Sequence, residues 1–111
     1  MAKKINVFIK EPGQKPKHVW ISNSEENLKK WLGGNYKFVG LSTDVDIMYN
    51  EDMIFSNLHF NCNICDVQFF GTIIFVGTGE EDEVISLPDD FDVKAMKRLF
   101  PQLYEEGEKN V

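Results

Sequence analysis

Two cysteines separated by two residues are the most chemically suggestive feature of this sequence of 111 residues. Cys62 and Cys65 could together chelate a zinc ion or form a redox-active dithiol. A structural zinc site needs four ligands, however, and the chain offers no second cysteine pair, so His18 and His59 would both have to converge on the same point. A redox dithiol would open a helix after a strand, whereas Cys65 precedes a β-rich stretch. We therefore expect ordinary thiols, with no metal site and no cofactor.

Nucleophilic catalysis would need a nucleophile, a base and a group that orients the base. The available pairs combine Cys62 or Cys65 with His18 or His59, and nothing in their spacing joins them. His18 alternates with Val19 inside an expected strand, which is typical of a packing residue rather than a base. The sequence thus predicts no catalytic residue and a protein that is not an enzyme. A small metal- or thiol-dependent enzyme built on Cys62 and Cys65 is the least favoured alternative.

The elements that would position any site begin with a β-hairpin. Residues Lys4–Ile9 alternate between apolar and other side chains, and Pro12 and Gly13 then form a turn. A second strand of the same kind follows over Lys17–Ser22. These two strands are expected to pair with each other.

A helix follows the hairpin. Asn23 or Ser24 can cap its first turn through a side-chain oxygen, and Gly33 can close its end in the left-handed conformation. The apolar residues that recur at helical spacing are Leu28, Trp31 and Leu32. The spacing places Trp31 in the buried stripe of this helix.

The remainder of the chain is rich in β-branched and aromatic residues. Further strands are predicted at Tyr36–Leu41, Val45–Tyr49, Met53–Phe55, Val67–Val76 and Val84–Leu87. A second helix should open at Asp92 and end before Pro101, because the residue before a proline avoids the α region. The predicted fold class is α+β, with a mainly antiparallel sheet of about six strands and two helices.

Length and charge narrow the class of protein further. We expect one domain over residues 1–111, with a core over about 4–103 and a frayed tail at 105–111. The formal charge of −6 repels phosphate backbones, so direct nucleic-acid binding is disfavoured. We find neither a signal peptide nor an apolar run long enough to span a membrane in the sequence. We therefore expect a cytoplasmic protein that binds no membrane.

Several short motifs, taken in order, resemble a family of small uncharacterised domains. The residues that carry this resemblance are Glu11-Pro12-Gly13, Lys15-Pro16, Asn23-Ser24, Leu28, Gly33-Gly34, Asn50-Glu51, Asn61, Gly71-Thr72 and Val76-Gly77. The sequence is similar to the domains of unknown function that bacterial phages, plasmids and other mobile elements encode, over about Ile5 to Leu87. Asp52-Met53 departs from the family pattern after Glu51, and the two cysteines have no counterpart in it.

The resemblance implies an accessory protein of a mobile element in the bacterial cytoplasm, without an assigned activity. Asn50, Glu51 and Asn61 are polar positions of its pattern, and turn chemistry is the simplest explanation of them. They are weak candidates for an interaction site. Trp20 is a further candidate, because it lies on the opposite strand face from Val19 and Ile21.

Two functions of different classes agree with these observations. The first is a non-enzymatic module that binds a protein, which the absence of a catalytic set and the many aromatic residues favour. The second is an acidic decoy that imitates nucleic acid and occupies a DNA-binding enzyme. The decoy requires that the acidic runs at residues 80–83 and 89–92 form one face. The identity of the protein partner and the oligomeric state do not follow from the sequence.

Overall fold

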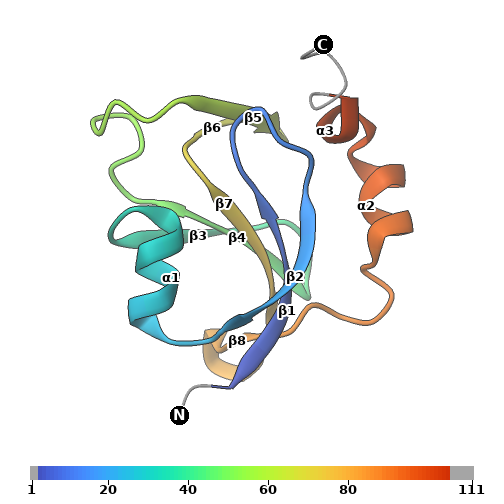
Figure 1. Ribbon diagram of the computed structural model, residues 1–111. Helices are drawn as coiled ribbons and strands as arrows, with labels where there is room; N and C mark the ends of the chain where they lie inside the picture. Colours follow the sequence, from blue (N-terminus) through green and yellow to red (C-terminus); the bar gives the residue numbers. More distant parts are fainter. Residues whose placement is uncertain (1–2, 106–111) are drawn as a thin grey trace.

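The computed structural model describes residues 3–105 (Figure 1). It contains a large antiparallel sheet, a separate hairpin and short helices that cover the faces of the sheet. The strands are β1 (Lys4–Lys10), β2 (Lys17–Ser22), β3 (Tyr36–Gly40), β4 (Val45–Asn50), β5 (Phe60–Ile64), β6 (Val67–Phe70), β7 (Ile73–Thr78) and β8 (Val84–Ile85). The helices are α1 (Glu25–Leu32), α2 (Val93–Leu99) and α3 (Pro101–Glu105), with a 3₁₀ turn over Glu80–Asp82.

The main sheet has the strand order β2-β1-β7-β4-β3, and β8 pairs with β7. Every pairing is antiparallel, and β5 and β6 form a second sheet of two strands. The predicted α+β class with a mainly antiparallel sheet is therefore confirmed. The strands β2 and β3 lie at the two ends of the strand order.

The two faces of the sheet bury two separate hydrophobic clusters. Leu28 and Leu32 of α1 cover one face, where they pack with Ile74 and Val76 of β7. On the other face Phe75 packs with residues of the β5–β6 hairpin, α2 and α3, among which are Phe69, Met96 and Leu103. The alternating side chains of β7 thus enter different clusters, which explains why this strand is apolar throughout.

The boundaries of α1 are where local sequence placed them. The Ser24 hydroxyl accepts a hydrogen bond from the Asn27 backbone N–H at 3.1 Å, which caps the first turn. Gly33 follows the last turn with φ 80°, and its N–H donates to the Lys29 carbonyl. A residue without a side chain adopts this left-handed conformation at little steric cost.

Two expected strands differ in the structure, and one helix is added to the two that were expected. The predicted strand over residues 67–76 is two strands, because Gly71 has φ 80° and breaks the extended backbone between β6 and β7. The predicted strand Met53–Phe55 is a series of turns, which begins where the Asn50 side-chain oxygen accepts a hydrogen bond from the Asp52 N–H at 2.7 Å. Pro101 ends α2, as predicted, and also starts α3, because proline is well suited to the first helical position.

The sequence analysis predicted no strand over Phe60–Ile64, where the structure has β5, the strand that carries Cys62. Of the expected tail, Glu105 is the last residue of α3, and residues 106–111 lie outside the described part of the chain. In the described part, no helix is long and apolar enough to cross a membrane.

Candidate functional site

Asn50 and Glu51, two of the predicted interaction candidates, occupy different environments. Asn50 is buried, and its side-chain amide donates to the Leu32 carbonyl at 2.9 Å, which satisfies a carbonyl at the end of α1. Its oxygen accepts from Asp52, so Asn50 both closes a helix and opens a loop. Glu51 is exposed. The turn chemistry expected of Asn50 is confirmed, and the side chain is not available at the surface.

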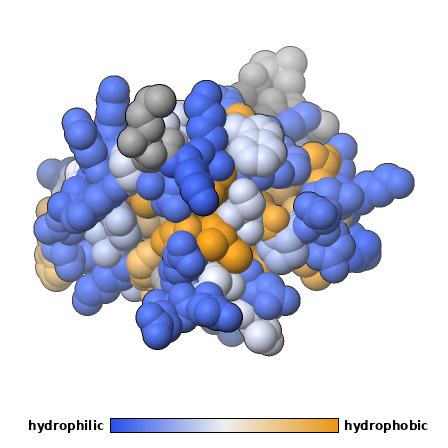
Figure 2. All heavy atoms as spheres, turned by 90° about the horizontal axis from the view of Figure 1, so that it is seen from below, coloured by the Kyte–Doolittle hydropathy of each residue, from blue (hydrophilic) through white to orange (hydrophobic). Residues whose placement is uncertain are grey.

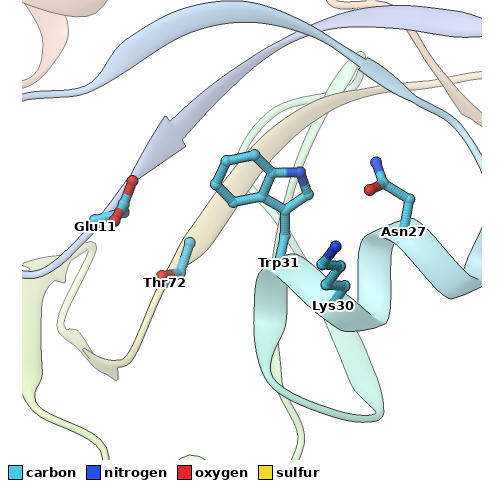
Figure 3. Close-up of a pocket in the computed structure, with 5 residues that line it drawn as sticks. All are labelled: Glu11, Asn27, Lys30, Trp31 and Thr72. Atoms are coloured by element: carbon cyan, nitrogen blue, oxygen red, sulfur yellow. The ribbon is translucent and has the colours of Figure 1, made fainter.

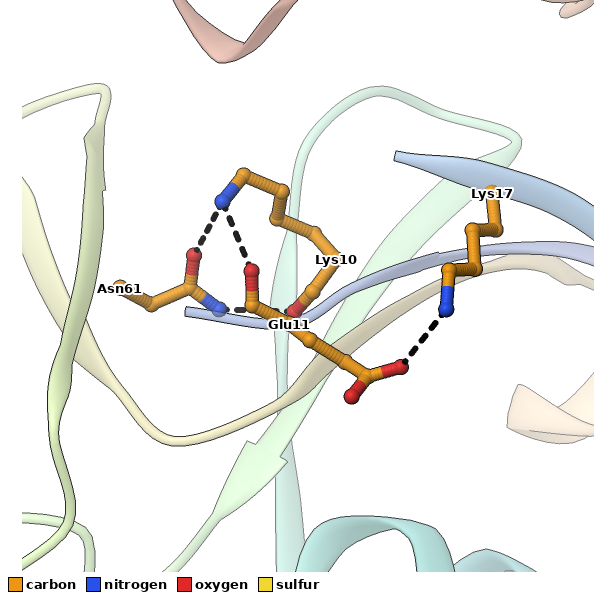
Figure 4. Close-up of polar contacts among 4 residues, drawn as sticks. All are labelled: Lys10, Glu11, Lys17 and Asn61. Carbon is orange, nitrogen blue, oxygen red and sulfur yellow. Dashed lines mark hydrogen bonds and ion pairs between the residues drawn. The ribbon is translucent and has the colours of Figure 1, made fainter. Parts of the chain in front are cut away.

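Asn61 is also buried, but it forms a long-range polar network rather than a turn (Figure 4). Its amide donates to the Lys10 carbonyl at 2.7 Å and to the Gly71 carbonyl at 2.8 Å. Its oxygen accepts from the Lys10 ammonium at 3.0 Å, and the same ammonium donates to the Glu11 carbonyl at 2.9 Å. Asn61 thereby ties β5 to the end of β1 and to the turn between β6 and β7.

Lys10 is fully buried, and the sequence analysis missed it. The available signal was alternation, because Lys10 shares a strand face with the buried Phe8. A buried ammonium is stable only when hydrogen bonds compensate for the lost hydration. The Lys10–Asn61 network is therefore an architectural feature that fixes three segments relative to one another.

A groove lies next to this network, between α1 and the ends of β1 and β7. It consists of two neighbouring cavities of about 340 and 240 Å³, which share Lys30, Trp31 and Thr72. Figure 3 shows the Trp31 indole reaching from α1 toward the strands, with Glu11 and Thr72 on one side and Asn27 on the other. The second cavity is also lined by Pro12, Leu32, Gly33, Asn57, Leu58, His59 and Gly71.

Trp31 occupies a position that helical spacing alone did not reveal. It is 38% exposed, although the spacing placed it in the buried stripe of α1. Leu28 and Leu32 complete that stripe, and Trp31 lies at its edge over the groove. Helical periodicity identifies a face, but the area that the sheet covers decides where the buried face ends.

An exposed apolar loop runs from Glu51 to Asn57. Ile54 is 71% exposed and Phe55 is 87% exposed, and they are adjacent in the chain. Met53 is partly buried and packs against the hydrophobic cluster on the hairpin side of the sheet, so the base of the loop is held in place. The continuation of the loop, through Asn57, enters the wall of the groove.

Trp20 is 63% exposed on β2, in agreement with the strand alternation. It stands opposite Asn6 on β1, and the neighbouring position on its own strand face is the exposed His18. Figure 2 shows the molecule from below, where apolar atoms gather near the centre and recur towards both sides between hydrophilic side chains.

The two cysteines differ in burial. Cys62 is buried in the hairpin-side cluster, which is the hydrophobic cluster around Phe69, Phe75 and Met96. Cys65 is exposed in the turn between β5 and β6. Between residues 3 and 105, no group of three or more histidine, cysteine or acidic side chains could hold a metal ion. This arrangement gives no support to a joint chemical role of the two thiols.

The two acidic runs lie apart. In Figure 1 the 3₁₀ turn over Glu80–Asp82, next to β8, and the segment before α2 stand on opposite sides of the lower ends of β1 and β2. Asp92 caps α2 by accepting a hydrogen bond from the Ala95 N–H at 3.0 Å. The backbone of the two runs is therefore separated, which does not favour the single acidic face that the decoy hypothesis requires.

Two tyrosines, Tyr36 and Tyr104, have a raised pKa. Burial raises the pKa of Tyr36 from its usual value, and the nearby carboxylate of Glu25 adds to this shift against the opposing charge of Lys29. Burial alone raises the pKa of Tyr104. Neither tyrosine lines the groove, so these shifts reflect packing and do not identify a general acid or base there.

Comparison with family models identifies the class of this protein. Residues 5–101 match the family described as "Domain of unknown function (DUF3846)", and the chain belongs to that family. No curated protein matches the chain, and no solved structure does. The expected membership of a family of uncharacterised domains is thus confirmed.

Proposed function

We propose that this domain is a non-enzymatic module that binds a protein partner, and that the loop from Glu51 to Asn57 makes the central contact. The observation that carries the proposal is the exposure of Ile54 and Phe55 at adjacent positions. Burying such a side chain contributes about 1.5–3 kcal/mol, so the pair could dominate a small interface. The partner is a protein with an apolar pocket that receives Phe55.

The surroundings of the loop favour a protein over a lipid surface. Glu51 and Asp52 precede the apolar pair in the same loop and are exposed, and the whole chain carries a formal charge of −6. These charges oppose approach to anionic membranes and to nucleic acids. A protein pocket can accept the apolar tip while its rim interacts with the two carboxylates.

The biological setting of this proposal comes from the resemblance in the sequence. An accessory protein of a phage or another mobile element, acting in the bacterial cytoplasm, would find its partner among the proteins of the host or of the element itself.

The test compares two variants in an affinity pull-down from a bacterial lysate. Ile54→Ser/Phe55→Ser removes the apolar tip, and Trp20→Ser is the matched control, because it removes an exposed aromatic ring from β2. We expect the loop variant to lose specific proteins that wild type and the Trp20 variant retain. With such a protein purified, the loop variant should raise its Kd about 30-fold or more, corresponding to ~2 kcal/mol.

The salt dependence of the same Kd separates this proposal from the acidic decoy. A contact based on apolar burial should persist when salt shortens the screening length from ~10 Å toward ~3 Å, whereas a charge-based contact should weaken steeply. Equal binding by wild type and the loop variant would overturn the proposal. Loss of binding in the Trp20 variant alone would instead assign the contact to β2.

A further inference from the structure

We infer that the groove beside Trp31 is a binding site for a small ligand that combines a flat aromatic ring with an acidic group. This inference concerns a different surface from Ile54 and Phe55, so it stands or falls separately from the proposed protein contact. The larger cavity, of about 340 Å³, lies within the usual range for small-molecule sites, which starts at roughly 300 Å³.

Trp31 supplies the part of the site that would recognise a flat ring. Its indole is a wall of both cavities and is only partly exposed (Figure 3). Flat aromatic systems stack on such a surface in an offset or edge-to-face arrangement. Leu58 and Pro12 line the neighbouring cavity and extend the apolar surface beside the ring.

The acidic group is inferred from the hydrogen-bond donors of the groove. The Lys30 ammonium, the Trp31 indole N–H and the Thr72 hydroxyl have no hydrogen bond or ion pair to another residue within positions 3–105. In contrast, the Glu11 carboxylate already forms an ion pair with the Lys17 ammonium at 3.4 Å (Figure 4). Because Lys17 offsets the charge of Glu11, Lys30 gives the groove a local positive charge on a chain of net charge −6.

Asn27 provides an oriented acceptor in the same place. Its backbone N–H donates to the Ser24 hydroxyl at 3.1 Å, and its side-chain amide donates to the Ser22 carbonyl at 2.9 Å. The second bond orients the side chain, so its oxygen can accept a hydrogen bond from a ring N–H or a hydroxyl of the ligand. A mononucleotide and an aromatic carboxylic acid both combine the required ring and charge.

The test is a fluorescence titration of the full chain carrying Trp20→Phe, which leaves Trp31 as the only tryptophan. The probes are adenosine 5′-monophosphate, phenylacetate, adenosine and inorganic phosphate. We expect saturable quenching with Kd below about 1 mM for at least one of the two acidic ring compounds. Adenosine and phosphate should each bind at least about tenfold more weakly than the preferred acid.

Lys30→Met should weaken the preferred acid by about tenfold or more and leave the adenosine titration unchanged. Lys29→Met is the matched control, because Lys29 is paired with Glu25 at 3.0 Å on the same helix and lines neither cavity. Binding of only one of the two acidic compounds would show whether the ligand is a mononucleotide or an aromatic carboxylic acid. Absence of saturation with both acids, or affinities that are the same in the Lys30 variant, would overturn the inference.

Discussion

The Lys10–Asn61 network and the Ile54–Phe55 loop depart from the usual distribution of polar and apolar residues in opposite directions. The network buries an ammonium and an amide, and hydrogen bonds of 2.7 to 3.0 Å satisfy them. The loop exposes two large apolar side chains that pack against nothing comparable. A satisfied buried polar group has a structural explanation within the chain, whereas an exposed apolar pair requires an explanation outside it.

The comparison predicts that changes in the network reduce stability and that changes in the loop reduce binding only. Asn61→Leu should have the largest effect. It removes the donor to two buried backbone carbonyls and an acceptor of the Lys10 ammonium, so we expect a loss of about 3 kcal/mol or more in the free energy of unfolding. Urea unfolding measures this change.

Asn63→Leu is the control for that measurement, because Asn63 is exposed on the same strand. It should alter the free energy of unfolding by less than about 0.5 kcal/mol. Similar losses in the two variants would mean that the network contributes no more than ordinary strand packing.

The two cysteines sharpen the comparison with one residue type in two environments. Cys62→Ser places a hydroxyl in the hairpin-side cluster and should cost about 1–3 kcal/mol of unfolding free energy. Cys65→Ser changes an exposed turn residue and should cost less than about 0.5 kcal/mol. Thermal unfolding of the two variants in reducing buffer measures the difference, and equal melting temperatures would contradict it.

Phe55→Ser should have the smallest effect on stability, within about 0.5 kcal/mol of wild type. The Phe55 side chain is 87% exposed, so little apolar area is lost from the folded state. Urea unfolding of this variant next to wild type measures the change. A loss above 1 kcal/mol would show that the loop supports the fold, and the case for an external partner would then weaken.

Local sequence determined the parts of this protein whose cause is also local. Ser24 and Gly33 delimit α1 because a cap depends on a few neighbouring residues, and the alternation in β2 placed Trp20 on the strand face opposite the buried Ile21. The antiparallel α+β class followed from short strands separated by turn residues. The candidate groove did not follow from any of these patterns.

Only the tertiary structure decided which polar residues are buried and which apolar residues are exposed. Alternation placed Lys10 on a strand face, but the strand β5 folding over that face buries it, and no local pattern predicts such an event. The groove likewise joins Glu11, Trp31 and Thr72 from three distant segments. The loop with Phe55 has a strand-like composition, yet β7 and β3 already occupy both edges of β4, so the segment after β4 finds no partner strand there and remains at the surface.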